Sequence, residues 1–243
     1  MILLIDQGNS ALKWCCYDDN HFTKSTVGEL NELLAFAKLN DKTITDIYIS
    51  CVKNQNQLAL ITRSFIQHNL CQPVSIATTS ANFGPLTNAY HQFEQLGVDR
   101  WLAMIAVWKK LQSGFIVVDA GSALTLDIVD STGQHLGGHI IPGLSMQTKL
   151  LMSDTDGIVV DSNIKTQAHL PGHSTTEAVL NGCLTNLCSY IDNMYHRYSE
   201  ANSLPLFLTG GDAIHLSRGL EIQHQLQNKL VLEGLYYLLN STE

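Results

Sequence analysis

The sequence predicts an α/β fold made of two similar lobes. Along most of the 243 residues, segments with the pattern of β-strands alternate with segments that have the 3.6-residue period of helices. Two stretches, LLIDQGNSALKWCCYDD and IVVDAGSALTLDIVDSTG, look alike: each is an apolar strand that ends in Asp-x-Gly, followed by a small polar residue and a second strand. Their aspartates, Asp6 and Asp119, lie about half a chain length apart, which favours a duplicated lobe over a short-period repeat.

The elements of the first half follow the first look-alike stretch. Residues 47–52 and 73–78 indicate strands on either side of an amphipathic helix over 55–69. A further helix is expected over 99–112, with lysines near its C-terminal end. Its apolar residues form a stripe: Trp101, Leu102, Ile105, Trp108 and Leu111.

The second half repeats the alternation. GGHIIPGLSMQTKLLM, residues 137–152, is expected to form a glycine-rich turn and a short helix. A long helix is expected over 174–197, a strand with a glycine turn over 204–213, and a closing helix over 227–240. No linker rich in Pro, Gly or Ser separates the halves, so the duplication sets the predicted lobes at 1–112 and 113–243.

Composition and charge narrow the class of protein. The formal net charge is −8, and the 14 Lys and Arg residues never cluster, which argues against nucleic acid and anionic membranes as partners. No segment has the length and apolarity of a membrane span, and the N-terminal apolar run is too short for a signal peptide. We therefore expect a cytoplasmic protein whose six cysteines, which include no CxxC pair, are reduced and mostly buried.

The turn after the first strand, residues 6–10 (DQGNS), has two interpretations. Glycine, amide and hydroxyl residues are usual in a hairpin turn. The same residues form a phosphate cradle if backbone amides face the ligand, with Asp6 holding magnesium and Lys13 reaching the phosphates. Residues 119–123 (DAGSA) offer a second such turn, and TGGDA at 209–213 a third against which a base or ribose could lie.

Two helix starts carry further candidates. In GVDR, residues 97–100, Asp99 has the ordinary role of an N-cap and Arg100 that of a solvated first-turn residue; the alternative makes Asp99 a general base and Arg100 a carboxylate anchor. In STTEAVLNG, Ser174 and Glu177 are expected to form a capping box, and the two threonines between them are ordinary residues of the first helical turn.

Taken together, these segments resemble the type III pantothenate kinases. DQGNSALKW, GVDRW, DAGSALT, GGHIIPG, STTEAVLNG and TGGDA occur in the order of the family's motifs. The resemblance implies two duplicated ribonuclease-H-like lobes of the actin-like and sugar-kinase superfamily, with an ATP cleft between them. It also implies a homodimer that phosphorylates the primary hydroxyl of pantothenate with ATP, in the first step of coenzyme A synthesis. Mg²⁺ and a monovalent cation, K⁺ or NH₄⁺, are the implied cofactors.

The resemblance assigns the nucleotide side of the site. The residues implied to bind the ATP phosphates are Asp6, Gln7, Gly8, Asn9, Ser10, Ala11, Leu12 and Lys13. Asp6 is implied to lie near Mg²⁺, directly or through water. Ser122, where the family usually has Thr, is implied to meet ATP; because the hydroxyl is kept, we expect at most a modest effect on nucleotide affinity.

The substrate side is assigned in the same way. Asp99 is the implied proton acceptor, and the implied substrate-binding residues are Tyr90, Gly97, Val98, Asp99, Arg100 and Thr175. Thr175 is implied to reach pantothenate from the neighbouring subunit, with Thr176 as the alternative if the register shifts by one. Asp119 is implied to help bind the monovalent cation. The competing interpretations are an ATP-binding regulator resembling the Bvg accessory factor class, and a kinase or phosphohydrolase acting on another small molecule.

Overall fold

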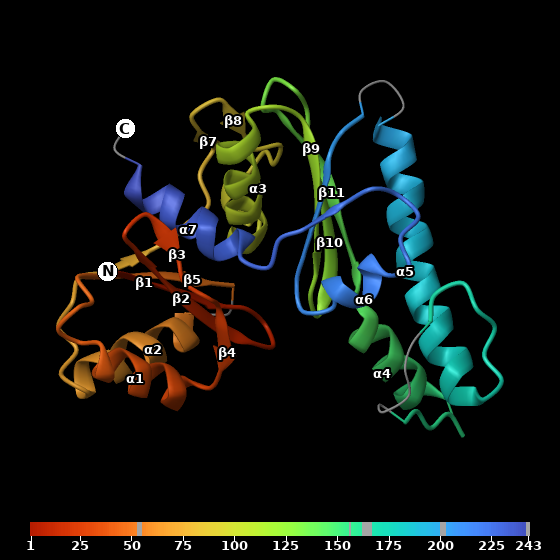
Figure 1. Ribbon diagram of the computed structural model, residues 1–243, viewed down its shortest axis with the longest axis horizontal. Helices are drawn as coiled ribbons and strands as arrows, with labels where there is room; N and C mark the ends of the chain where they lie inside the picture. The colour runs from red at the N-terminus through yellow and green to blue at the C-terminus, as the bar shows by residue number, and fades with distance from the viewer. Residues whose placement is uncertain (53–54, 156, 162–166, 200–202, 242–243) are drawn as a thin grey trace. The chain divides into compact units, whose positions relative to one another are not determined.

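The computed structural model describes residues 1–52, 55–155, 157–161, 167–199 and 203–241 (Figure 1). The chain divides into two compact units. Unit 1 contains Met1–Gln112, Thr132–His135 and Lys229–Glu243, and unit 2 contains Ser113–Ser131 and Leu136–Asn228.

Unit 1 is built on a mixed sheet. Its strands are β1 (Ile2–Gln7), β2 (Leu12–Asp18), β3 (His21–Phe22), β4 (Thr26–Gly28), β5 (Asp46–Cys51) and β6 (Val74–Ile76). They lie in the order β3-β2-β1-β5-β6, with β4 paired to β2. β1 is antiparallel to β2 and parallel to β5. Two short strands, β7 (Asn82–Phe83) and β8 (Leu86–Thr87), form a separate ribbon.

Helices cover both faces of this sheet. α1 (Leu30–Leu39) and α2 (Gln55–Gln67) pack on the face that carries Leu3 and Ile5 and share one apolar core with it. α7 (Leu230–Asn240) packs against β1, β2 and β5 and beside α3 (Val98–Leu111), which also contacts β5. Because side chains alternate along a strand, the residues of β1 on the α7 side are those on either side of Ile5, namely Leu4 and Asp6. A 3₁₀ turn, Phe93–Gln95, leads into α3.

Unit 2 repeats the arrangement. Its strands are β9 (Phe115–Ala120), β10 (Ala123–Val129), β11 (His135–Pro142), β12 (Leu206–Thr209) and β13 (Gln225–Leu226), in the order β11-β10-β9-β12-β13. β9 is antiparallel to β10 and parallel to β12. α4 (Leu144–Asp154), α5 (Thr175–Ser199) and α6 (Ala213–Ser217) complete the unit.

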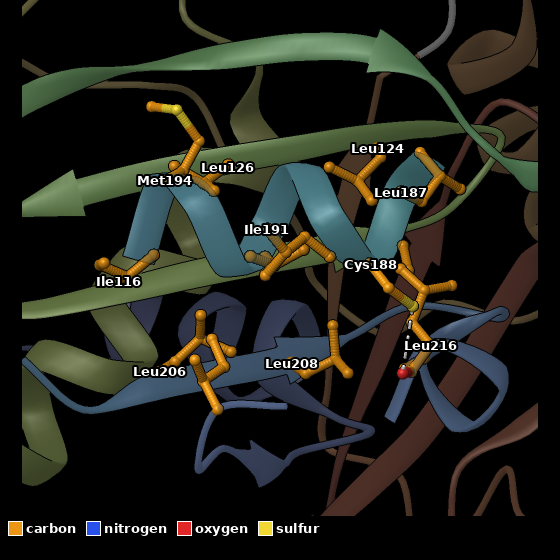
Figure 2. Close-up of a cluster of buried hydrophobic side chains, with 14 of the residues drawn as sticks. Ile116, Leu124, Leu126, Leu187, Cys188, Ile191, Met194, Leu206, Leu208 and Leu216 are labelled. Atoms are coloured by element: carbon orange, nitrogen blue, oxygen red, sulfur yellow. Dashed lines mark hydrogen bonds between the residues drawn. The ribbon is translucent and has the colours of Figure 1, made fainter. Parts of the chain in front are cut away.

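The core of unit 2 lies between its sheet and α5 (Figure 2). One face of α5 points Leu187, Cys188, Ile191 and Met194 toward the apolar side chains of β9, β10 and β12. The Cys188 thiol donates to the backbone carbonyl of Leu216 at 3.6 Å, which fixes α6 to this helix. Burial of this continuous apolar surface is the main favourable term that holds α5 on the sheet.

The two sheets have the same strand order, with β1, β2 and β5 in the places that β9, β10 and β12 occupy in the second sheet. In both, the strand that ends in Asp-x-Gly is central, with an antiparallel neighbour and a parallel one. The predicted α/β architecture with two similar lobes is therefore confirmed.

The lobe limits of 1–112 and 113–243 stay a prediction about the duplicated sequence. The compact units group the chain differently, because the closing helix α7 belongs to unit 1. There the carbonyl of Leu102 in α3 lies so close to Gly234 that a Cβ atom would come within 1.9 Å of it. Glu233 also forms an ion pair with Lys110 of α3.

Two local expectations need correction. Four residues of the predicted apolar stripe of α3 are buried, but Leu111 is exposed, and burial extends beyond the stripe to every residue from Arg100 to Trp108. Elements pack around this helix on several sides, so it is buried in the interior of the unit. The expected glycine-rich turn in GGHIIPG is part of strand β11, where Gly137 has a positive φ of 112°.

All six cysteines are free thiols, and Cys15, Cys16, Cys183 and Cys188 are buried, as expected for reduced core residues. Burial raises the pKa of Cys15 and of Cys188 to about 12, so both remain protonated at neutral pH. Among the described residues, no helix combines the length and apolarity needed to cross a bilayer.

Candidate active site

The turn after β1 is a hairpin, and its shape is compatible with both interpretations of its sequence. Gly8 to Ala11 connect β1 to β2, and the Gly8 N–H donates to the Ala11 carbonyl at 3.0 Å. Asn9 and Ser10 are exposed at its tip, whereas Asp6 is only 6% exposed. The turn therefore presents amide and hydroxyl groups to solvent above a buried carboxylate.

Asp6 lies in a row of polar residues across three strands. Its register partners are Lys13 on β2 and Ser50 on β5. Directly paired residues place their side chains on the same face of the sheet, roughly 5 Å apart at Cβ. Ser50 is 0% exposed, and its hydroxyl has no hydrogen-bond partner among the described residues. Sequence reasoning missed Ser50, because it sits in an ordinary-looking apolar strand.

Asp99 and Arg100 lie in the first turn of α3, not at its cap. Gly97 is the N-cap, Val98 the first helical residue, and Asp99 Oδ1 accepts the backbone N–H of Arg100 at 2.8 Å. The expected N-cap role of Asp99 was therefore wrong. A solvated Arg100 was wrong as well, because its side chain is only 5% exposed. A Cβ atom at Gly97 would lie 2.7 Å from Asp99 Oδ1, so only glycine leaves the carboxylate in this place.

Tyr90 joins this pair of residues. Its hydroxyl accepts a hydrogen bond from Arg100 Nη1 at 2.9 Å, and the guanidinium carbon lies 5.7 Å from the centre of its ring. Tyr90 also lines a cavity of about 590 Å³ together with Ala89, His91, Gln92 and Gln95. The structure thus brings together two of the predicted substrate residues, Tyr90 and Arg100, which are ten positions apart in sequence.

The second Asp-x-Gly turn lies in unit 2. Asp119 on β9 is paired in register with Thr125 on β10 and Thr209 on β12, so one carboxylate and two hydroxyls share a face. Gly210 has a φ of 101°, and a Cβ atom there would lie 2.5 Å from Asp119 Oδ1. The third glycine turn thus packs directly against the carboxylate, which only glycine permits.

Two further contacts complete this turn. The carbonyl of Ser122 accepts the N–H of Gly143 at 3.0 Å, and Asp212 donates its backbone N–H to Ala120 at 2.9 Å. A Cβ atom at Gly143, the N-cap of α4, would lie 2.3 Å from the Gly121 carbonyl. Burial raises the pKa of Asp212, although His215 partly opposes this shift. Backbone contacts thus fix the turn that carries Ser122.

Thr175 and Thr176 have different environments at the start of α5. Thr176 Oγ1 donates to the carbonyl of Val159 at 3.2 Å and accepts the N–H of Asp161 at 3.3 Å. Thr175 instead lines a cavity of about 460 Å³ between α4 and α5. The predicted capping is half confirmed: Ser174 Oγ accepts the Glu177 N–H at 3.2 Å, but the Glu177 carboxylate accepts the N–H of His173.

The structure places the predicted site residues in separate groups, and their roles stay predictions. Unit 1 carries Asp6 and Lys13 in one row, and Tyr90 with Asp99 and Arg100 in another group. Unit 2 carries Asp119 and Ser122 at one turn and Thr175 at a distinct cavity. The predicted ATP cleft between the lobes stays a prediction.

The family model described as type III pantothenate kinase matches residues 2–197, more than half of the chain. The chain belongs to the type III pantothenate kinase family. A relative named type III pantothenate kinase, from Marinobacter nauticus, is 34% identical over 97% of this chain and 96% of its own length.

Solved structures share the fold of this chain over nearly its whole length. A Baf family protein from Campylobacter jejuni superposes with a TM-score of 0.63 at 21% identity, covering 98% of this chain and 97% of the other. A Sinorhizobium meliloti protein described as a 2-dehydro-3-deoxygalactonokinase superposes with a TM-score of 0.61 at 11% identity, covering 98% and 99%. At these identities the likeness establishes the fold alone.

Membership of the type III pantothenate kinase family implies ATP and a divalent metal ion, and the residues present fit this requirement. Among the described residues, no three His, Cys, Asp or Glu side chains gather into a metal cage. Mg²⁺ does not need such a cage, because it keeps several waters and is held by one or two carboxylates with phosphate oxygens. A buried carboxylate beside a hydroxyl, as at Asp6 and Ser50, supplies hard oxygen donors of this kind.

Proposed function

We propose that this protein transfers the γ-phosphoryl group of ATP to the primary hydroxyl of pantothenate, the first step of coenzyme A synthesis, in the cytoplasm. Family membership over residues 2–197 supports this assignment. The observation that carries it within the site is the first turn of α3, where Asp99 stands next to a buried Arg100 that is bonded to Tyr90. Catalysis of phosphoryl transfer requires mainly that the reactants are positioned, that the phosphate charge is neutralised and that a group accepts the hydroxyl proton.

On the nucleotide side, the hairpin from Asp6 to Lys13 binds the ATP phosphates through the Gly8–Ala11 backbone and the exposed Asn9 and Ser10 side chains. Asp6 holds Mg²⁺, directly or through water, and Lys13 adds positive charge from the neighbouring strand. When bound, Mg²⁺ neutralises charge that develops on the phosphate oxygens. In unit 2, the proposed contact with ATP is made by Ser122.

On the substrate side, Asp99 accepts the proton of the attacking hydroxyl, and Gly97 and Val98 line the same turn. Arg100 and Tyr90 bind the carboxylate of pantothenate. An arginine with little exposure is well suited to this task, because its planar donors match a carboxylate and less water has to be removed.

Two further assignments concern unit 2. Asp119 helps to bind the monovalent cation, K⁺ or NH₄⁺, and its neighbours Thr125 and Thr209 add hydroxyl oxygens on the same face. Thr175 contacts pantothenate bound to the partner subunit of a homodimer. The cavity beside Thr175 supports this choice over Thr176, whose hydroxyl is already bonded to the segment before α5.

The test combines purified protein with Mg²⁺-ATP and pantothenate, with K⁺ present or replaced by Na⁺, and detects phosphopantothenate by mass spectrometry. We expect product in K⁺ and much less in Na⁺. ATP binding without product in any salt would support the regulator instead. ATP turnover that does not depend on pantothenate would indicate another substrate.

Asp99→Asn separates the proton-accepting role from a structural one. The Asn Oδ1 atom still accepts the Arg100 N–H, so the turn keeps its hydrogen bond. We expect kcat to fall by about 10² to 10⁴, the usual contribution of a positioned base. An Asn variant with full activity would remove Asp99 from the reaction.

A further inference from the structure

Four residues, which end at the first residue of β11, belong to unit 1, although β10 and the rest of β11 belong largely to unit 2. Thr132–His135 pack with the segment that leads to Tyr90. Thr87 donates its backbone N–H to the Gly133 carbonyl at 2.9 Å and its hydroxyl to Gln134 Oε1 at 2.7 Å. Gly133 has a φ of 91°, and a Cβ atom there would lie 2.7 Å from the Pro85 carbonyl, so only glycine permits this approach.

His135 is the last residue of this segment and is 0% exposed. Its Nδ1 accepts the backbone N–H of Ala89 at 3.3 Å. Its ring lies parallel to the Tyr90 ring, with an interplanar angle of 10° and centres 6.4 Å apart. The His135 side chain thus contacts both the backbone before Tyr90 and the Tyr90 ring. Because Nδ1 accepts this hydrogen bond, the hydrogen of the neutral imidazole ring is on Nε2.

Tyr90 in turn contacts Arg100. The Tyr90 hydroxyl accepts a hydrogen bond from Arg100 Nη1 at 2.9 Å, and the guanidinium carbon lies 5.7 Å from the centre of the Tyr90 ring. The order of contacts is therefore His135, Tyr90, Arg100 and then Asp99, whose carboxylate accepts the Arg100 N–H. A shift of the Tyr90 ring would leave the buried guanidinium with one fewer fixed partner.

We propose that His135 is a positioning residue for substrate binding, which holds Tyr90 and, through it, Arg100 in the geometry that receives the substrate carboxylate. The inference rests on the proposed function. Arg100 binds a carboxylate through its planar donors. If its side chain is fixed before the substrate arrives, less rotational freedom is lost on binding and the affinity is higher. His135 does not contact the reacting atoms in this scheme, so it acts on substrate affinity.

The test compares His135→Ala, His135→Asn and His135→Phe. Asn offers an oxygen near the place of Nδ1 and keeps the acceptor for Ala89, whereas Phe keeps the stacked ring and removes the acceptor. We expect His135→Ala to raise KM for pantothenate by about tenfold or more, with kcat and KM for ATP changed less than about threefold. Asn and Phe should each restore part of the loss.

His139→Ala is the matched control. His139 lies four positions further along β11, is exposed, and shares a hydrogen bond with Tyr190 of α5. It should leave KM for pantothenate unchanged. An unchanged KM in a folded His135→Ala protein, or equal losses in kcat and in KM for ATP, would overturn the positioning role.

A second measurement does not depend on activity. Amide hydrogen exchange of Ala89, followed by NMR, should be slow in the wild-type protein and in His135→Asn, and faster in His135→Phe. Equal protection in all three would contradict the proposed contact. If the wild-type protein makes no phosphopantothenate, the proposed function fails, but this exchange experiment still decides whether His135 fixes the Tyr90 segment.

Discussion

Ser50 shows how much one side chain depends on its neighbours in space. In sequence it is a small polar residue near the end of an apolar strand. In the structure it is paired in register with Asp6, fully buried, and its hydroxyl has no hydrogen-bond partner among the residues described. A buried hydroxyl in this state costs stability, and such costs collect at functional sites.

Ser50→Ala is therefore expected to have opposite effects on stability and on ligand binding. Without ligand, the free energy of unfolding should rise by about 1 kcal/mol, because the unsatisfied hydroxyl is removed at almost constant volume. With Mg²⁺-ATP, we expect the ligand to stabilise the variant less than it stabilises the wild-type protein. Urea unfolding with and without Mg²⁺-ATP measures both. A variant that is less stable without ligand would mean that the hydroxyl has a structural partner.

Asp99 and Arg100 illustrate the limit of local rules. A polar residue near a helix start is most often a cap, and an arginine in a first turn is most often solvated. Both expectations were wrong because Gly97 takes the cap position and the tertiary fold buries the arginine against Tyr90. The family motif identified these residues as candidates, while spacing alone favoured the ordinary roles.

Among the elements of unit 1, the helices α3 and α7 pack closely against each other. Their backbones approach at Gly234, which faces the carbonyl of Leu102, and Lys110 and Glu233 pair beside it. Since α3 carries Asp99 and Arg100 in its first turn, the position of both groups depends on this contact.

Gly234→Ala should push the two helices apart. A new Cβ atom would lie 1.9 Å from the Leu102 carbonyl oxygen, which is backbone and cannot rotate away. We expect a loss of about 2–4 kcal/mol in the free energy of unfolding, at or above the usual range for overpacking. Urea or thermal unfolding measures the loss.

Gly182→Ala in α5 is the matched control. It is also a helical glycine, but a Cβ atom there meets nothing within 4 Å. The better helix propensity of alanine should raise stability by up to about 1 kcal/mol. Similar destabilisation by both substitutions would show that the backbone contact at Gly234 is not responsible.

At the scale of the whole molecule, unit 2 exposes several large apolar side chains on β11 and α4. They are Leu136, Ile140, Met146, Leu150, Leu151 and Met152. Met146 and Leu150 lie four positions apart on α4 and therefore share one helix face, and exposed apolar side chains that are grouped in this way mark an interaction surface. The homodimer proposed above is the partner that this surface would receive.

We expect light scattering after gel filtration to give twice the chain mass of 26.8 kDa. Leu150→Glu, at a side chain that is 54% exposed, should shift the protein toward monomer without unfolding it. If Thr175 completes the partner's substrate site, the monomer should also lose pantothenate turnover. A stable monomer in the wild-type protein would contradict the dimer.

Local sequence patterns were enough to predict the alternation of strands and helices, the duplicated Asp-x-Gly turns and the family motifs, because these depend on residues close together in the chain. Periodicity also located α2, α5 and α7 to within a few residues. The glycine content of GGHIIPG predicted a turn where the structure has strand β11. Glycine content is a local signal, whereas the pairing that forms a strand depends on residues elsewhere in the chain.

The contacts between residues that are distant in sequence became known from the three-dimensional structure alone. The row of Lys13, Asp6 and Ser50 depends on the register of three strands. The contact of His135 with Tyr90 joins residues that are far apart in the sequence. Such contacts arise from how apolar faces pack, and packing surrounds a side chain with groups that its neighbours in sequence do not specify.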